Sequence, residues 1–307
     1  MELSIVVPCY NEEKNIKLFY DKIYETFLKK KIEYEIVFVN DGSNDNTKEE
    51  LNKLEKEKKQ NVKIIHFSRN FGKEAAMLAG LKETIGELVT IIDADLQQNP
   101  KYILQMMDIL DKNEEYSSVA CFQKQRKESG VLSFFKRSFY KLINKMSTIE
   151  FVNGASDFRL FKRKMVDAIL QMSEYHRFSK GIFSFVGFRT YYLEYDVEER
   201  ASGSSKWNFK KLFNYALEGI IGYTTVPLRF SFYLSFLFFI VTLVILICSI
   251  ITKFVLGKVI LLFISLIAAL LFLTLGILGE YLAKVYMETK NRPIYIVEDR
   301  KTFKKEK

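Results

Sequence analysis

The first part of the chain alternates short apolar segments with longer segments of helical periodicity. The apolar segments are Leu3–Val7, Glu35–Val39, Val62–Phe67 and Leu88–Ile92. Amphipathic patterns fill the gaps, at roughly 13–30, 45–58, 73–84 and 100–112. Strands that are apolar almost throughout and alternate with helices are typical of a mostly parallel, Rossmann-like sheet covered on both faces. We therefore expect an α/β domain.

Each predicted strand ends at a polar turn. The turns begin at Pro8, Asn40, Ser68 and Asp93. In open α/β sheets, ligands bind beyond the carboxyl ends of the parallel strands. We expect the binding site at this edge of the sheet.

Two uncharged apolar runs, Phe230–Ile251 and Val259–Gly279, lie near the C-terminus. A helix rises about 1.5 Å per residue, so each run is long enough to cross the hydrocarbon core of a bilayer. Only Thr252–Lys258 separates them. We therefore expect a transmembrane hairpin with spans at about 230–251 and 259–283. A pair of buried core helices is the alternative, disfavoured because few soluble helices extend so far without a charge.

Basic residues are more frequent after the second run than in the loop between the runs. The flank carries Lys284, Lys290, Arg292, Arg300, Lys301, Lys304, Lys305 and Lys307, whereas the loop carries Lys253 and Lys258. The positive-inside rule then predicts that both termini are cytoplasmic. The segment Met1–Pro8 lacks the basic region and cleavage site of a signal peptide. We expect a cytoplasmic domain at 1–229, divided into halves at 1–129 and 130–229, and a cytoplasmic basic tail at 284–307.

The 307 residues carry a formal net charge of +9. The basic residues lie largely in amphipathic and juxtamembrane segments, which favours anionic lipid over nucleic acid as a partner. The three cysteines have no metal-binding spacing, and two histidines leave little material for a zinc site or a serine-type triad. We expect a lipid bilayer as partner and no nucleic acid.

Polar motifs follow the predicted strands in a fixed order. They are Val6–Glu12, Asn40–Ser43, Arg69–Lys73, Asp93–Gln97 and Ser156–Leu160, with Glu288–Pro293 after the second apolar run. In this order and spacing the chain resembles family 2 glycosyltransferases, most closely bactoprenol (undecaprenyl-phosphate) glucosyltransferases and more distantly dolichyl-phosphate mannose synthase. The resemblance covers nearly the whole chain. It implies a GT-A nucleotide-sugar fold, a divalent metal (Mg²⁺ or Mn²⁺) and inversion at the sugar carbon.

Asp93 and Asp95 are the candidate metal ligands. They are two residues apart at a strand end, so their side chains are expected to point to the same side. Mg²⁺ takes one or two carboxylates and completes its shell with water and phosphate oxygens. Gln97 is a candidate for a further oxygen ligand or for orienting a metal-bound water. An ordinary polar turn is the alternative.

The resemblance also assigns contacts to the donor nucleotide sugar. The assigned residues are Pro8, Asn11, Glu12, Asp41, Lys73 and Asp93. Asp41 can accept hydrogen bonds from the uracil or ribose, and Lys73 opens a predicted helix near the diphosphate. A simple turn around Asp41 and a surface role for Lys73 are the alternatives. Many members of the resembling family carry Asp where this chain has Asn40, so the resemblance does not carry a metal or phosphate role over to that position.

An acceptor phosphate is already largely anionic near neutral pH. Asp157, at the position of the catalytic base in the resembling family, can therefore align the sugar as well as accept a proton. Pairing with Arg159 is its structural alternative. Cations must hold the acceptor phosphate. The candidates are Arg126, Arg137, Arg200 and Lys206.

Two further stripes of apolar residues have helical spacing, at Val131–Met146 and Phe209–Tyr223. We interpret them as interfacial amphipathic helices that hold the site near the headgroups, with packing on the sheet as the alternative.

Together these features predict an inverting transfer of one hexose, from UDP-glucose, to undecaprenyl phosphate at the inner (plasma) membrane of a bacterium. The product would be a polyprenyl-phosphate-sugar for cell-envelope glycan modification. A donor carrying N-acetylglucosamine, galactose or mannose and a non-catalytic scaffold that binds nucleotide sugar are the alternatives. A processive synthase is disfavoured, because the chain has two spans and lacks a Gln-x-x-Arg-Trp element. Homo-oligomerisation stays open.

Overall fold

The computed structural model describes residues 1–28, 30–56, 61–123, 141, 144–145, 147, 152, 154–196, 221–252 and 256–302. The chain divides into two compact units. The first comprises residues 1–142, 149–208 and 293–307, and the second comprises residues 143–148 and 209–292.

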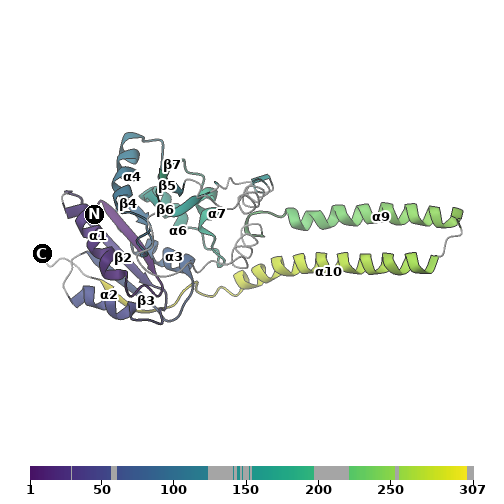
Figure 1. The fold of residues 1–307 in the computed structure, drawn as a ribbon, viewed down its shortest axis with the longest axis horizontal. Helices are drawn as coiled ribbons and strands as arrows, with labels where there is room; N and C mark the ends of the chain where they lie inside the picture. The colour runs from purple at the N-terminus through teal and green to yellow at the C-terminus, as the bar shows by residue number, and fades with distance from the viewer. Residues whose placement is uncertain are drawn as a thin grey trace. The chain divides into compact units, whose positions relative to one another are not determined.

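Among the described residues, eight strands form one sheet in the first unit (Figure 1). The strands are β1 (Leu3–Cys9), β2 (Tyr34–Asn40), β3 (Val62–Phe67), β4 (Leu88–Ile91), β5 (Ser118–Gln123), β6 (Ala155–Lys162), β7 (Thr190–Tyr195) and β8 (Val297–Thr302). Their order across the sheet is β7-β5-β6-β4-β1-β2-β3-β8. The four central strands are parallel, as their apolar sequences predict. β6 and β8 flank them as antiparallel strands.

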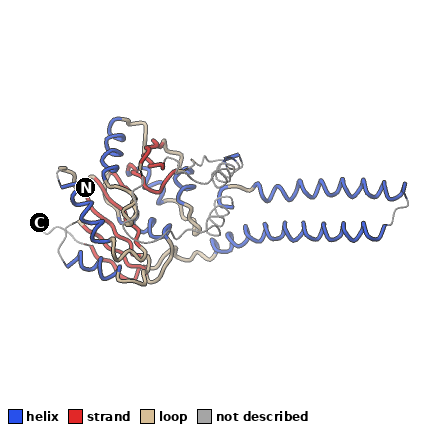
Figure 2. Tube along the Cα trace, in the orientation of Figure 1, coloured by secondary structure: helices blue, strands red, loops and turns tan. Residues whose placement is uncertain are grey.

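Helices cover both faces of this sheet (Figure 2). On one face lie α1 (Ile16–Leu28), α2 (Thr47–Lys56) and α4 (Lys101–Lys112). On the other lie α3 (Lys73–Glu83), α6 (Arg163–Leu170) and α7 (Ser179–Phe185). Side chains of β1 alternate between the two faces of the sheet. Leu3, Ile5 and Val7 pack with α1, whereas Val6 packs with α6. The two-faced burial predicted from the apolar strands is confirmed.

Helix α3 approaches the sheet closely. Small side chains, among them Ala75, Ala76 and Ala79, face β2 and β3. A Cβ atom added at Gly80 would overlap Val6 Cγ1 and lie 3.3 Å from Val39 Cγ2. The first turn of α3 carries Lys73 and follows the carboxyl end of β3 at Phe67.

The C-terminal residues contribute an element that the sequence did not reveal. Within the segment expected to be a basic tail, Val297–Thr302 forms β8 and pairs with β3 from Phe67 to Lys63. The Tyr295 ring stacks on the Phe67 ring with centroids 4.9 Å apart. This strand lies at the sheet edge, where charged side chains are tolerated, and most of its residues are charged. Its sequence therefore looks like that of a solvent-exposed tail.

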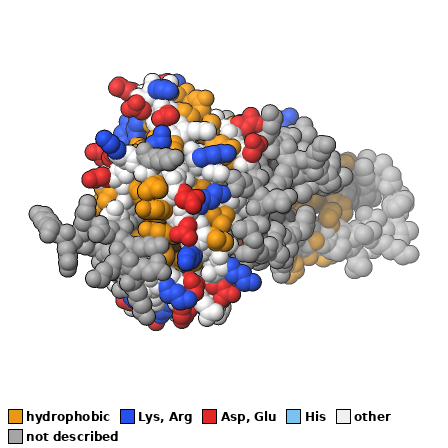
Figure 3. All heavy atoms as spheres, turned by 60° about the vertical axis from the view of Figure 1, so that its left-hand side comes forward, with side chains coloured by type: hydrophobic (Ala, Val, Ile, Leu, Met, Phe, Trp, Pro, Cys, Tyr) orange, Lys and Arg blue, Asp and Glu red, His pale blue; other side chains and the backbone are white. Residues whose placement is uncertain are grey.

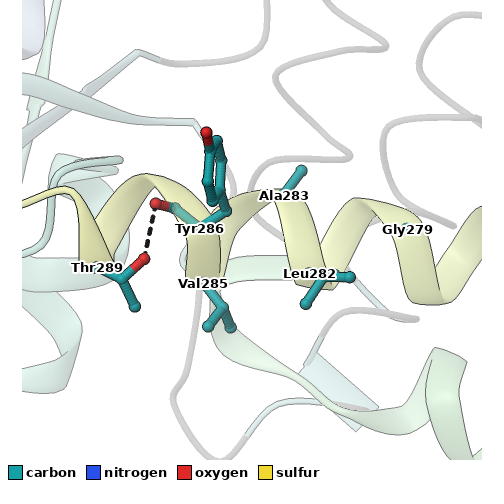
Figure 4. Close-up of a pocket in the computed structure, with 6 residues that line it drawn as sticks. All are labelled: Gly279, Leu282, Ala283, Val285, Tyr286 and Thr289. Carbon is teal, nitrogen blue, oxygen red and sulfur yellow. Dashed lines mark hydrogen bonds between the residues drawn. The ribbon is translucent and has the colours of Figure 1, made fainter.

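The second unit contains two long helices, α9 (Val226–Thr252) and α10 (Leu256–Thr289), which lie side by side (Figure 1). By length and composition, one helical segment among the described residues can cross a membrane. It is Leu266–Thr289, with 24 residues and a mean hydropathy of 2.1. An apolar pocket of about 510 Å³ lies along α10 (Figure 4). Its lining residues are Gly279, Leu282, Ala283, Val285, Tyr286 and Thr289.

Acidic and basic side chains are intermixed over the described face drawn in Figure 3, with hydrophobic side chains between them. The predicted amphipathic helices at Val131–Met146 and Phe209–Tyr223 lie almost entirely outside the described residues. They stay predictions.

Candidate active site

Two loops at the carboxyl ends of β1 and β2 are joined by hydrogen bonds. The Asn11 N–H donates to Ser43 Oγ at 3.0 Å, and the Asn44 N–H donates to Asn11 Oδ1 at 2.9 Å. The Glu12 N–H donates to Thr47 Oγ1 at 2.8 Å. Asn11 has a φ of 55°, a conformation that Asn tolerates better than most residues. Pro8, Asn11 and Glu12 therefore lie beside the turn that carries Asp41. Their contacts to a donor stay a prediction.

Asp41 anchors the loop that leads into α3. Its Oδ1 accepts from the Phe71 N–H at 2.6 Å, and its Oδ2 accepts from the Gly72 N–H at 2.9 Å. Burial raises the pKa of the Asp41 carboxyl to about 6, although these N–H groups and Arg69 act to lower it. The adjacent Gly42 has a φ of 58°, and a Cβ atom there would lie 2.5 Å from the Asn70 nitrogen. The structure thus gives Asp41 a role in loop geometry that the sequence did not suggest.

The Asn40 side chain is buried in the protein. Its Oδ1 accepts from the Ser43 N–H at 3.1 Å, and its Nδ2 lies 3.1 Å from Nδ1 of the buried His66. The Asn40 side chain therefore holds the turn after β2 and contacts His66.

Polar and apolar residues alternate in the segment after β4. Asp93, Asp95 and Gln97 are partly exposed, whereas the intervening Ala94 and Leu96 are buried in the core. The expected common orientation of the two carboxylates stays a prediction, because β4 ends at Ile91 and Ala94 and Asp95 lie in a turn. A neighbouring residue, Gln98, is nearly buried and holds Asp93. Its Oε1 accepts from the Asp93 N–H at 3.0 Å, and its Nε2 donates to Asp93 Oδ2 at 3.2 Å.

The antiparallel pairing of β6 with β4 brings Asp157 close to Asp93. Ile91 pairs with Arg159, so continuing this register by two residues sets Asp157 beside Asp93. The ammonium of Lys73 joins the two carboxylates. Its Nζ lies 2.7 Å from Asp93 Oδ1, 3.0 Å from Asp93 Oδ2 and 3.2 Å from Asp157 Oδ2. Asp157 is therefore paired with Lys73, while the Arg159 Nε donates to the Ser156 carbonyl at 3.0 Å.

These contacts shift the pKa values of Lys73 and Asp157. Burial acts to lower the pKa of the Lys73 ammonium, but Asp93 and Asp157 raise it above its ordinary range. Burial acts to raise the pKa of Asp157, but Lys73 and Lys180 lower it below its ordinary value. Both groups are therefore charged at neutral pH.

Sequence reasoning missed a second layer around this cluster. Glu74, next to Lys73, accepts from the Ser179 N–H at 3.0 Å and also from Ser179 Oγ, which ties α3 to the start of α7. Burial raises the pKa of Glu74 to about 7, with repulsion from Asp157 adding to the effect. Lys180 follows Ser179, and its charge acts on Asp157. No local pattern marks these residues, because Glu74 and Ser179 are 105 residues apart in the sequence.

Asp93 and Asp95 offer the chemistry of a divalent-cation site. Within the described ranges, no group of three or more His, Cys, Asp and Glu side chains is arranged to hold a metal ion. Mg²⁺ does not need such a cage, because it binds through one or two carboxylates and takes water and substrate phosphate oxygens as its other ligands. The two partly exposed carboxylates fit this requirement.

Four predicted residues of the acceptor site stay untested. Arg126, Arg137, Arg200 and Lys206 lie outside the described residues.

Comparison with known structures identifies the fold of the first unit. The crystal structure of glucosyl-3-phosphoglycerate synthase from Mycobacterium tuberculosis, in complex with Mn²⁺, UDP and phosphoglyceric acid, shares the fold. It matches with a TM-score of 0.52 and 16% identity, over 72% of this chain and 76% of that chain. The first unit therefore has a GT-A fold.

The family follows from sequence. The family model described as "Glycosyl transferase family 2" matches residues 4–170. A relative described as an uncharacterized glycosyltransferase, sll0501 of Synechocystis sp., is 40% identical over 97% of this chain and 95% of its own length. The bactoprenol glucosyl transferase of Shigella phage SfX is 38% identical over 98% of this chain and 100% of its own length. The chain belongs to glycosyl transferase family 2.

Proposed function

We propose that the protein transfers a single glucose residue from UDP-glucose to undecaprenyl phosphate, with inversion at the sugar carbon. The observation that carries this proposal is the match to the bactoprenol glucosyl transferase of Shigella phage SfX, which extends over the full length of that protein. It therefore includes the apolar helices as well as the GT-A domain. A match limited to the nucleotide-binding half would support the proposed donor but not the proposed lipid acceptor.

The loops beyond β1, β2 and β4 bind the donor in this proposal. Asn11, Glu12 and the turn at Asp41 form the nucleotide pocket, and Lys73 supplies positive charge for the diphosphate. A divalent cation, Mg²⁺ or Mn²⁺, held by Asp93 and Asp95 would stabilise the negative charge of the departing diphosphate. Gln98 keeps the Asp93 carboxylate in a fixed orientation through two hydrogen bonds.

Asp157 acts on the acceptor side. A lipid phosphate is largely ionised at neutral pH, so its attack on the sugar carbon needs little help from a base. Asp157 is itself ionised beside Lys73, and it orients the sugar for in-line attack by accepting a hydrogen bond from a sugar hydroxyl. Arg126, Arg137, Arg200 and Lys206 are the proposed ligands of the acceptor phosphate.

The proposal places the enzyme in the inner membrane of a bacterium. α9 and α10 form the two spans, at about 230–251 and 259–283, and residues 1–229 and both termini are cytoplasmic. The apolar segment Leu266–Thr289 supports membrane insertion. The excess of basic residues after the second span supports the orientation.

A transfer assay with a panel of donors tests this function. Purified protein is incubated with undecaprenyl phosphate, Mg²⁺ and labelled UDP-glucose, UDP-N-acetylglucosamine, UDP-galactose or GDP-mannose. We expect label from UDP-glucose in the organic phase, attached to the lipid as one hexose. Label from another donor alone would replace the assigned sugar, and polymeric product would contradict single transfer. Absence of product with every donor would favour a non-catalytic scaffold.

A further inference from the structure

The Lys73 ammonium contacts the carboxylate of Asp93, a proposed metal ligand. Its Nζ lies within 3.0 Å of both oxygens of Asp93, one of the two proposed metal ligands. The same ammonium also contacts Asp157 at 3.2 Å. A single cationic side chain thus contacts both carboxylates and offsets part of their negative charge.

An ammonium and a divalent ion cannot share these oxygens without cost. Like charges a few ångströms apart repel strongly in a partly desolvated site. Metal binding to Asp93 therefore requires Lys73 to move away. A nucleoside diphosphate offers Lys73 new anionic partners, and its oxygens also complete the shell of the metal.

The surroundings of Lys73 allow such a movement of the side chain alone. The Lys73 side chain is 42% exposed and has a flexible four-carbon stem. In contrast, Gln98 holds the Asp93 carboxylate, and Glu74 holds the first turn of α3 against Ser179. Asp41 fixes the preceding residue, Gly72, through its N–H. The backbone and the Asp93 carboxylate are anchored, whereas the Lys73 side chain is partly exposed and can change rotamer.

We propose that Lys73 is an internal counter-ion that blocks the metal site until a nucleoside diphosphate draws its ammonium away, so that metal binding depends on donor binding. This inference rests on the metal site of the proposed function and adds an order of binding, with the nucleoside diphosphate promoting binding of the metal. Lys73 is in this respect a positioning residue, because it acts on the metal through Asp93.

The test is a titration of Mn²⁺ against purified full-length protein, with free Mn²⁺ measured by electron paramagnetic resonance, without and with saturating UDP. The wild type should bind Mn²⁺ weakly alone and more tightly with UDP. Lys73→Met should bind Mn²⁺ without UDP about tenfold more tightly than the wild type or better, because one unit of adjacent positive charge is gone. Lys73→Gln, which is also neutral, is the second variant and should behave in the same way.

Two controls isolate the position of the charge. Lys73→Arg keeps the cation and should stay close to the wild type. Lys112→Met removes an exposed lysine at the end of α4, and it should leave Mn²⁺ affinity unchanged because salt screens remote surface charges. An increase with the two neutral variants at position 73, and not with Lys73→Arg or Lys112→Met, supports the inference.

The outcomes separate this inference from the proposed function. If the wild type binds Mn²⁺ with UDP, but the Met and Gln variants bind it no more tightly than the wild type without UDP, the counter-ion role is overturned and the metal site stands. If the wild type binds no Mn²⁺ even with UDP, the metal site and the counter-ion role are both overturned.

Discussion

At the scale of single residues, the buried carboxylate of Asp41 determines how the chain enters α3. Its two oxygens accept hydrogen bonds from the N–H groups of Phe71 and Gly72. Hydrogen bonds to charged groups contribute about 1.5–3 kcal/mol each. The loop that leads to Lys73 therefore depends on the Asp41 carboxylate for its conformation.

Asp41→Asn tests this dependence. The Asn side chain has only one acceptor oxygen, and its amide nitrogen would face a backbone N–H. We expect the free energy of unfolding to fall by about 1–3 kcal/mol, and UDP affinity to fall with it because the loop loses its anchor. Chemical denaturation and UDP titration measure the two effects. Asp108→Asn, at an exposed position of α4, is the matched control. Equal stability of the two variants would contradict the anchoring role.

Glu74 gives a prediction about pH. Its pKa is about 7 in the folded protein and 4.5 as its ordinary value. As pH rises between these values, the unfolded chain releases the proton first, so the folded state loses stability. Glu74→Gln removes this titration, and the stability of the variant relative to the wild type should therefore rise from pH 4.5 to 7. Thermal unfolding across this range measures it. A difference between the two proteins that does not change with pH would contradict the burial of an ionisable Glu74.

At the scale of elements, α3 positions the site because it lies so close to the sheet. Ala at position 80 would favour helix by about 1 kcal/mol relative to Gly. However, the added Cβ atom would overlap Val6, and overpacking a core costs about 1–3 kcal/mol. We expect Gly80→Ala to be destabilising in chemical denaturation and to weaken UDP binding by displacing Lys73. A stabilised variant with unchanged UDP affinity would show that α3 has room to move.

The edge strand β8 gives a second prediction at this scale. The Tyr295 ring stacks on Phe67, whereas the neighbouring Ile296 side chain is exposed. Tyr295→Ala should lower the free energy of unfolding by at least about 1 kcal/mol, because it removes an aromatic pair as well as buried area. Ile296→Ala is the matched control and should change stability little. Equal effects of the two substitutions would indicate that the strand is not docked through Tyr295.

The elements differ in how far the sequence predicts them. The four central strands have apolar sequences that only a sheet covered on both faces can bury, so their parallel pairing was predictable. β8 was not, because an edge strand exposes one side and can carry the charges of Glu298, Asp299 and Arg300.

At the scale of the whole molecule, the candidate site combines residues that the sequence predicts with residues that only the fold reveals. Asp93, Asp157 and Lys73 were predicted from their motifs, and the structure brings them together through the β4–β6 register and the start of α3. The contact of Glu74 with Ser179 depends on how α3 and α7 pack, which no local pattern encodes. Sequence thus indicated the charged groups of the site, whereas the groups that hold them in place required the fold.

The central claim is that the carboxylates beyond β4 support transfer of glucose to a lipid phosphate with the help of a divalent cation. The most direct measurement is the initial rate at which labelled UDP-glucose and undecaprenyl phosphate give organic-extractable product, for wild type, Asp95→Asn and the exposed control Asp108→Asn. We expect Asp95→Asn to lose on the order of 100-fold or more in rate, Asp108→Asn to match the wild type, and a chelator to abolish the wild-type rate. Full turnover by Asp95→Asn, or by the wild type stripped of divalent ions, would contradict the account.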